Sequence, residues 1–364
     1  MKSRVRQNIL KVKQYVPGKP IEEVQRELGL KKVVKLASNE NCMGPSPKAV
    51  EAVRKAVREV NRYPDASSFY LRKQVSKSLG VDEGSLIFGN GSDEIIGMAI
   101  RTFVGDGDEV VIARPTFLIY EIMCQLQNAV VKFVPLARGM KHDLKAMKEA
   151  ITDKTKIVFI ANPDNPTGTY VSRKELDEFF KGLPDEVIVF LDEAYFEFAR
   201  YEFKDYPDGR DYLARPGVIV ARSFSKAYGL AGLRAGYGIS SPEIINYMER
   251  TREPFNMNLL AQAGAAAAVG DKSFLKKTLS HVTLQKKFFY SEFKKLGLDC
   301  VESATNFVLV NVKMDCKDLF SALLKRGVIV RDMKAWGLDT YIRVTVGTAA
   351  ENRKFINALK GALK

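Results

Sequence analysis

The sequence predicts an α/β protein with two domains of unequal size. Short apolar runs alternate with helical patterns over most of the first 270 residues. Several of these runs are continuously apolar, which is typical of the strands of a mainly parallel sheet covered by helices on both faces. After about residue 270 the runs alternate between apolar and polar residues, as expected of a smaller α+β unit. We therefore expect an N-terminal arm (1–38) that packs on the small domain and a partner subunit, a large domain (39–270) and a small C-terminal domain (271–364).

The large domain is expected to begin with a helix and to contain at least six strands. Ser46 and Pro47 supply an N-cap and a first-turn proline. The apolar residues that follow at helical spacing predict one buried face, made of Ala49, Val53, Ala56, Val57 and Val60. Strands are expected at 86–88, 109–113, 130–134, 156–161, 187–191 and 218–221, and a capping box at 172–175 starts a helix between two of them.

The small domain is expected to combine one long helix with a short sheet. A basic helical pattern covers 274–296, and apolar runs follow at 306–312, 328–331 and 341–346. Two more helical patterns, at 317–325 and 350–363, complete the unit.

The amino-acid composition limits the classes of function that we expect of this protein. The 364 residues include 57 Lys and Arg against 43 Asp and Glu, a formal net charge of +14, which favours anionic partners. The basic residues are spread along the chain and no helix-turn-helix extension or basic tail is visible, so we expect small anionic molecules rather than nucleic acid. Two histidines, four scattered cysteines and no CxxC or HExxH spacing argue against a metal site and against a Ser-His-Asp hydrolase.

Location is predicted from what the sequence contains. The first residues are basic and carry no apolar run of the signal-peptide kind. No apolar stretch approaches the roughly 20 residues that span a bilayer. We expect a cytoplasmic protein with free thiols and no membrane partner.

Polar residues gather where the predicted strands end. The segment 162–168 (Asn-Pro-Asp-Asn-Pro-Thr-Gly) follows one strand, 192–195 (Asp-Glu-Ala-Tyr) follows the next, and 222–226 (Arg-Ser-Phe-Ser-Lys) follows a third. Arg234 comes eight residues after Lys226, and a glycine turn at 89–94 precedes a helix. In doubly wound sheets ligands bind beyond the carboxyl ends of the strands, so these groups should share one site.

Together the residue types match a single ligand. A buried carboxylate can keep a pyridine nitrogen protonated, and a tyrosine and an asparagine can contact a phenolic oxygen. A lysine can bond to an aldehyde. Two hydroxyls, an arginine and the amides at a helix start can enclose a phosphate. The ligand with these groups is pyridoxal 5′-phosphate.

At these residues the sequence closely resembles the fold-type I, pyridoxal-phosphate-dependent aminotransferases. Within that superfamily it is similar to the class II subfamily of histidinol-phosphate aminotransferases. The resemblance covers almost the whole chain, through segments at 15–18, 39–41, 61–64, 115–117, 254–258, 261–262 and 342–347. It implies transamination between glutamate and imidazole acetol phosphate, which gives histidinol phosphate and 2-oxoglutarate in histidine biosynthesis.

The resemblance also implies roles for single residues. Lys226 would bond the cofactor and move a proton, Asp192 would pair with the pyridine nitrogen, and Asn165 and Tyr195 would contact the phenolic oxygen. Tyr120 would stack on the ring. The cofactor phosphate would be surrounded by Gly91, Ser92, Asp93, Ser223, Ser225 and Arg234. Tyr63 would reach this phosphate from a neighbouring subunit, which implies a homodimer. Arg343 would bind the substrate anion, helped by Arg331 and Tyr15, with Asn39 also in the substrate site.

Some positions depart from the family pattern. Cys42 and Met43 stand where the family usually has a proline, and Phe117 replaces a frequent tyrosine. Phe117 and Trp336 could favour an apolar ring, so an aromatic amino acid aminotransferase stays open. So does a decarboxylase acting on threonine phosphate. His142 and His281 are predicted to be surface or capping residues.

Overall fold

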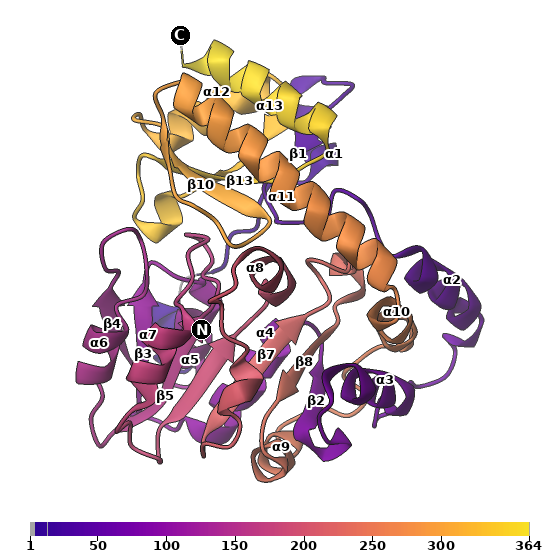
Figure 1. The fold of residues 1–364 in the computed structure, drawn as a ribbon, viewed down its shortest axis with the longest axis vertical. Coiled ribbons are helices and arrows are strands. Elements are labelled where there is room, and N and C mark those ends of the chain that lie inside the picture. The colour runs from indigo at the N-terminus through magenta and orange to yellow at the C-terminus, as the bar shows by residue number, and fades with distance from the viewer. Residues whose placement is uncertain (1–3, 13, 364) are drawn as a thin grey trace.

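The chain folds into two lobes of different size. The computed structural model describes residues 4–12 and 14–363. The larger lobe contains a seven-stranded sheet between helices, and the smaller lobe stands above it in Figure 1 with a four-stranded sheet of its own. The long helix α11 (Lys272–Lys295) runs from the smaller lobe toward α2 and α10 of the larger one.

The seven-stranded sheet confirms the predicted mainly parallel architecture. Its order is β2-β8-β7-β6-β5-β3-β4, and only β8 is antiparallel to its neighbours. The strands are β2 (Leu86–Gly89), β3 (Glu109–Arg114), β4 (Val130–Pro135), β5 (Thr155–Ala161), β6 (Ile188–Asp192), β7 (Val218–Ser223) and β8 (Gly236–Ile239). Ala161 lies opposite Asp192, and Asp192 lies opposite Ala221, so the carboxyl ends of β5, β6 and β7 share one edge.

Two apolar cores cover the two faces of this sheet, because successive strand residues point to opposite sides. Val189 and Leu191 of β6 pack with α2, α3, α6, α7 and α10, whereas Ile188 and Phe190 pack with α4, α5 and α9. The helices are α2 (Pro47–Ala56), α3 (Phe69–Leu79), α4 (Ser92–Phe103), α5 (Leu118–Leu126), α6 (Leu144–Glu149), α7 (Arg173–Phe180), α8 (Phe196–Glu202), α9 (Pro242–Glu249) and α10 (Leu259–Val269).

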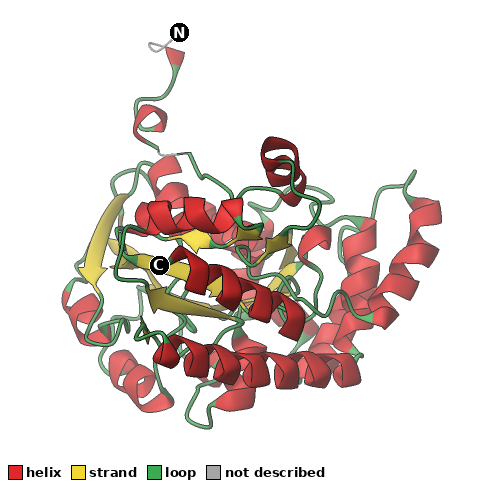
Figure 2. Ribbon diagram, turned by 90° about the horizontal axis from the view of Figure 1, so that it is seen from above, coloured by secondary structure: helices red, strands yellow, loops and turns green. Residues whose placement is uncertain are grey.

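The smaller lobe is an antiparallel sheet backed by helices. Its strands, in the order β12-β13-β10-β9, are β12 (Arg331–Asp332), β13 (Tyr341–Thr345), β10 (Phe307–Asn311) and β9 (Asp299–Cys300). The helices α12 (Cys316–Lys325) and α13 (Ala349–Ala362) join α11 there, and Figure 2 shows the helices of this lobe in front of its strands.

Part of the N-terminal arm belongs with the smaller lobe. Strand β1 (Val34–Lys35) pairs in parallel with β11 (Val328–Ile329), and α1 (Ile21–Leu28) buries Val24 against Ile329. In Figure 2 the described part of the arm that precedes Val12 projects from the body of the molecule, and the Asn8 side chain donates to the carbonyl oxygens of Gln125 and Leu126.

Several local predictions are confirmed and others are wrong. The Ser46 hydroxyl caps α2, and the capping box of Ser172 is present. The predicted buried face is wrong at Val57 and Val60, which are 49% and 59% exposed, because α2 ends at Ala56 and a 3-10 turn follows. Strand β8 was not predicted, since its glycine-rich start has low strand propensity.

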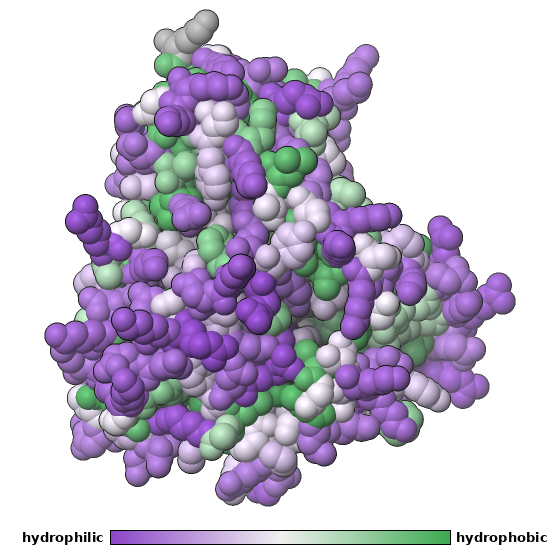
Figure 3. Space-filling model, viewed as in Figure 1, coloured by the Kyte–Doolittle hydropathy of each residue, from purple (hydrophilic) through white to green (hydrophobic). Residues whose placement is uncertain are grey.

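The surface of the molecule is mainly polar. Hydrophilic residues dominate the face in Figure 3, and apolar residues form small groups between them. Within the described residues, no helix has both the length and the apolar character needed to cross a membrane.

Candidate active site

A cavity of about 320 Å³ lies where the carboxyl edge of the large sheet faces the smaller lobe. Its walls come from the N-terminal arm, the larger lobe and β12 and β13 of the smaller lobe. The cavity brings together fourteen of the predicted site residues: Tyr15, Asn39, Ser92, Asp93, Tyr120, Asn165, Asp192, Tyr195, Ser223, Ser225, Lys226, Arg234, Arg331 and Arg343.

Asp192 is the last residue of β6 and is 5% exposed. Its Oδ2 accepts a hydrogen bond from the Tyr120 hydroxyl at 2.6 Å, and its Oδ1 accepts one from the Ala194 amide at 3.0 Å. Burial raises the pKa of Asp192 to about 6, although both hydrogen bonds oppose this rise. A cation in the cavity would favour the charged carboxylate, so this position suits a protonated pyridine nitrogen.

Two glycines shape an anion site at the start of α4. Gly91 has φ +83° and precedes the helix, and a Cβ built there would lie 2.7 Å from Nη2 of Arg234. A Cβ on Gly236 would lie 2.4 Å from the carbonyl carbon of Gly91 and 2.5 Å from the amide nitrogen of Ser92. The arginine also forms a 3.0 Å ion pair with Asp93. A helix start with unshared amides and a guanidinium is a phosphate cradle.

Lys226 lies in the connection between β7 and β8, three residues past the end of β7. Its Nζ is 5.8 Å from the centre of the Tyr195 ring. Burial, together with the positive charges of Arg343 and Arg234, lowers the pKa of Lys226 to about 8. Neutral amine, the form that attacks an aldehyde, is therefore available near neutral pH.

Asn39 ties Tyr195 to the smaller lobe. Its Nδ2 donates to the Tyr195 hydroxyl at 2.8 Å, and its backbone amide donates to Oγ1 of Thr345 at 2.9 Å. The Thr345 hydroxyl donates in return to Oδ1 of Asn39 at 3.1 Å. The role of Thr345 was not predicted, because it contacts Asn39 across 306 residues of chain.

Arg343 reaches the cavity from β13 and is almost fully buried. It donates to Oδ1 of Asn165 and, at 3.0 Å, to the carbonyl oxygen of Ala37. Its Nε has no hydrogen-bond partner among the described residues. Burial and the nearby charge of Arg331 both lower the pKa of Arg343.

A second layer of side chains holds the Asn165 loop. Asp164, which precedes Asn165, accepts from the Thr116 hydroxyl at 2.5 Å and lies 3.2 Å from Nε2 of His142. His142 is 6% exposed, so the expectation of a surface or capping histidine is wrong. The sequence shows Asp164 inside a turn motif, but it does not show that the distant residues Thr116 and His142 contact this aspartate.

Arg331 and Trp336 form one end of the cavity. The guanidinium carbon of Arg331 is 5.2 Å from the centre of the Trp336 ring, and its Nη2 donates to the carbonyl oxygen of Val16 at 2.8 Å. The indole N–H of Trp336 donates to the carbonyl oxygen of Thr116 at 2.9 Å. Trp336 therefore lines the cavity and also links the two lobes.

Tyr63 lies apart from these residues. It is 83% exposed, does not line the cavity, and stacks on Phe255 with ring centres 4.7 Å apart. Gly91 also lies outside the cavity lining, but it directly adjoins Arg234.

Comparisons with known proteins assign the family. The family model of class I and II aminotransferases matches residues 31–359. The chain belongs to this family. A histidinol-phosphate aminotransferase of Moorella thermoacetica is 48% identical over 362 residues, which cover 99% of this chain and 93% of the relative. One from Bacillus subtilis is 44% identical over 98% of this chain and 99% of its own length.

The fold of this aminotransferase has also been seen in solved structures. A histidinol-phosphate aminotransferase of Sinorhizobium meliloti, solved in complex with pyridoxal-5′-phosphate, superposes with a TM-score of 0.89. It is 29% identical and covers 99% of this chain and 98% of its own. The cofactor of this aminotransferase is pyridoxal 5′-phosphate, and the cavity fits it, because the Gly91–Gly236 cradle has room and donors for a phosphate and the buried Asp192 suits a protonated pyridine nitrogen.

Proposed function

We propose that this aminotransferase moves an amino group between glutamate and imidazole acetol phosphate, giving 2-oxoglutarate and histidinol phosphate in histidine biosynthesis. The observation that carries the proposal is the pair of arginines, Arg331 and Arg343, on the small-lobe side of the cavity. Neither guanidinium is paired with a carboxylate among the described residues, so the pair can receive a substrate carboxylate or a phosphate. The names of relatives that share 42–48% of their residues with this chain support the substrate.

The proposed roles follow from position. Bound pyridoxal phosphate supplies an electron sink for charge that develops at the substrate α-carbon. Lys226 would bond the cofactor aldehyde with loss of water. Once the substrate amine has replaced it there, the freed lysine amine would move the proton at the substrate α-carbon, since its lowered pKa permits both protonation states. Asp192 would keep the pyridine nitrogen protonated, and Asn165 and Tyr195 would contact the phenolic oxygen. Tyr120 would stack on the cofactor ring.

The anion sites divide between cofactor and substrate. The cofactor phosphate is assigned to the cradle formed by Gly91, Ser92, Asp93, Ser223, Ser225 and Arg234. Arg343 and Arg331 take the substrate anion, with Tyr15 and Asn39 beside them. The positive charge of these groups would also draw anionic substrates toward the cavity.

A homodimer is part of this proposal. Tyr63 would complete the phosphate site of a partner subunit, since it is exposed and stands away from its own cavity. Val57 and Val60, exposed just before it, and Phe255, stacked on it, would be covered in the same contact. The arm over residues 1–38 would pack on its own small lobe and on the partner.

The domain boundary is proposed between α10 and α11, near residue 270. The proposed location of the protein is the cytoplasm, with neither nucleic acid nor a membrane as a partner.

The test uses the cofactor-loaded protein and a panel of amino donors. Histidinol phosphate with 2-oxoglutarate should yield glutamate rapidly, and phenylalanine should be slow. Lys226→Ala should abolish turnover, whereas Arg343→Lys should mainly raise KM, since a lysine cannot form the two-pronged contact. Faster turnover of phenylalanine than of histidinol phosphate would move the protein to the aromatic aminotransferases. Release of carbon dioxide from threonine phosphate would instead identify a decarboxylase.

A further inference from the structure

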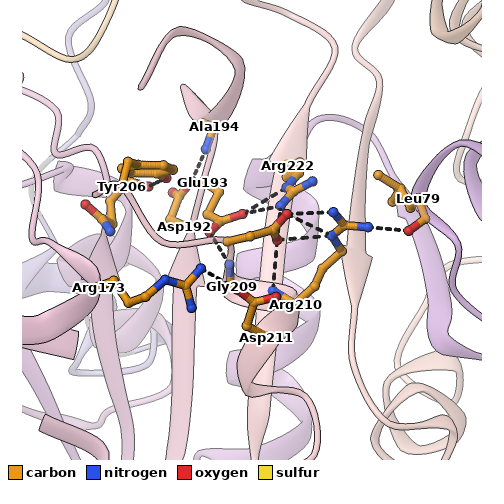
Figure 4. Close-up of polar contacts among 12 residues, drawn as sticks. Leu79, Arg173, Asp192, Glu193, Ala194, Tyr206, Gly209, Arg210, Asp211 and Arg222 are labelled. Atoms are coloured by element: carbon orange, nitrogen blue, oxygen red, sulfur yellow. Dashed lines mark hydrogen bonds and ion pairs between the residues drawn. The ribbon is translucent and has the colours of Figure 1, made fainter. Parts of the chain in front are cut away.

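A buried charged cluster lies on the side of the strand ends that faces away from the cavity. Its members are Glu193, Arg210 and Arg222, which are labelled in Figure 4, and Asp208, which bonds to both arginines. The side chains of Arg222 and Glu193 are each 2% exposed and meet at 2.7 Å. Arg222 also forms a 2.7 Å ion pair with Asp208, which Arg210 contacts from the outer side at 2.6 Å.

Each key member of this cluster is the chain neighbour of a cavity residue. Glu193 follows Asp192 at the end of β6, and Arg222 precedes Ser223 at the end of β7. Successive residues of an extended strand point to opposite sides, so one residue faces the cavity while its neighbour enters the cluster. The Glu193–Arg222 pair therefore joins β6 to β7 directly behind Asp192 and Ser223.

Further contacts fix this pair in place. The amide of Glu193 donates to the carbonyl oxygen of Ala221 at 2.8 Å, one residue beyond the ladder of β6 and β7. Its Oε1 accepts from the amide of Gly209 at 2.8 Å. The guanidinium of Arg222 also lies 3.4 Å from the centre of the Phe196 ring. Glu193 and Arg222 are thus each held from several directions.

Stability alone does not explain the cluster. Removing charges from water costs free energy that their attraction only partly returns, so apolar replacements of buried ion pairs are often neutral or stabilising. What an apolar pair lacks is the fixed direction of hydrogen bonds. Such direction is useful where a neighbouring group must keep its position, as Asp192 and Ser223 must against a cofactor.

We propose that Glu193 and Arg222 are positioning residues that hold Asp192 and Ser223 at a fixed separation for the pyridine nitrogen and phosphate of the cofactor. The proposal rests on the cofactor and not on which amino acid is the substrate. Neither side chain touches the cavity; each acts through the residue beside it.

The test compares Arg222→Met and Glu193→Gln with a matched control, Arg173→Met. The control removes an exposed arginine from its ion pair with Asp211, also drawn in Figure 4. We expect both cluster variants to weaken pyridoxal phosphate binding on the order of ten-fold and to shift the absorption maximum of the bound cofactor. The control should leave both quantities at wild-type values, and Arg222→Lys should recover part of the affinity.

The outcomes separate positioning from folding. A cluster variant with lowered thermal stability but wild-type cofactor affinity and absorption would overturn the proposal. Glu193→Gln keeps the size of the side chain, so it decides the question if Arg222→Met does not fold. Should the substrate assignment fail while cofactor affinity falls as expected, the positioning role would stand.

Discussion

The hydroxyl of Tyr120 donates a 2.6 Å hydrogen bond to Asp192, so this aromatic residue at the cavity favours the charged carboxylate. The hydrogen bond lowers the pKa of Asp192, against the stronger effect of burial, which raises it to about 6. The two residues come from α5 and β6, and Tyr120 is held by stacking on Phe159 of β5 with ring centres 4.7 Å apart.

Replacing Tyr120 with Phe should make cofactor binding more sensitive to acid. Loss of the donor raises the pKa of Asp192, so the carboxyl becomes neutral at a higher pH and no longer pairs with a pyridinium. We expect the affinity for pyridoxal phosphate to fall on the order of ten-fold at about pH 6 and much less at about pH 8. Titration of cofactor absorbance at several pH values measures this. Tyr201→Phe, which removes an exposed hydroxyl bonded to Ser280, is the control, and equal pH profiles would refute the prediction.

Replacing Gly236 with Ala should damage the phosphate cradle. The new Cβ would lie 2.4 Å from the carbonyl carbon of Gly91, so β8 or the start of α4 must move. Overpacking of this kind costs about 1–3 kcal/mol of folding free energy. The affinity for the cofactor should fall as well, because the amides that would bind its phosphate are displaced. Thermal unfolding with and without cofactor tests both effects. In Gly232→Ala, where a Cβ would have no atom of the described residues within 4 Å, neither the stability nor the cofactor affinity should change.

Lys226 should make the cofactor-free protein more stable at alkaline pH. Its pKa in the folded state is about 8, below the ordinary 10.5, so between these values the folded state binds fewer protons than the unfolded state. The free energy of unfolding therefore rises with pH across this window, by roughly 1–3 kcal/mol. Denaturant unfolding of the wild type and of Lys226→Met, compared at each pH, isolates the effect. A constant difference between the two proteins from pH 8 to 10.5 would contradict it.

Trp336 should limit the length of the substrate side chain. A second cavity of about 270 Å³ lies behind it, and both cavities are lined by Phe117 and Trp336. Trp336→Ala should join them and raise the kcat/KM for tryptophan relative to alanine roughly ten-fold or more. The control is Leu338→Ala, which alters the same apolar cluster but neither cavity. An unchanged ratio would show that the partition has no part in selectivity.

Much of the architecture could be predicted because the strands of the large sheet are continuous apolar runs with polar residues at their ends. The cavity at this edge followed from topology, and the resemblance named most of its residues. Strand β8 escaped prediction because glycines lower its strand propensity, and one of them, Gly236, is required by the close approach to Gly91. Contacts such as Asn39 with Thr345 depend on how the lobes meet, which no local pattern encodes. The Glu193–Arg222 pair lies within the larger lobe and depends on which strand pairs with β6 and in which register, and this too is not encoded by a local pattern.

The reversed direction of β8 has a consequence for the loop that joins it to β7. Because β8 runs against β7, the chain leaves the sheet after Ser223 and re-enters it at Gly236 on the same edge, and the amide of Phe224 bonds to the carbonyl oxygen of Ala235 at 3.0 Å. Ser225, Lys226 and Arg234 therefore sit on one closed loop with both ends clamped in neighbouring strands. Phe224, Ala227 and Leu230 of this loop are buried in the apolar cores, so the closed loop resists local opening and keeps the spacing of the three residues that it presents to the cavity.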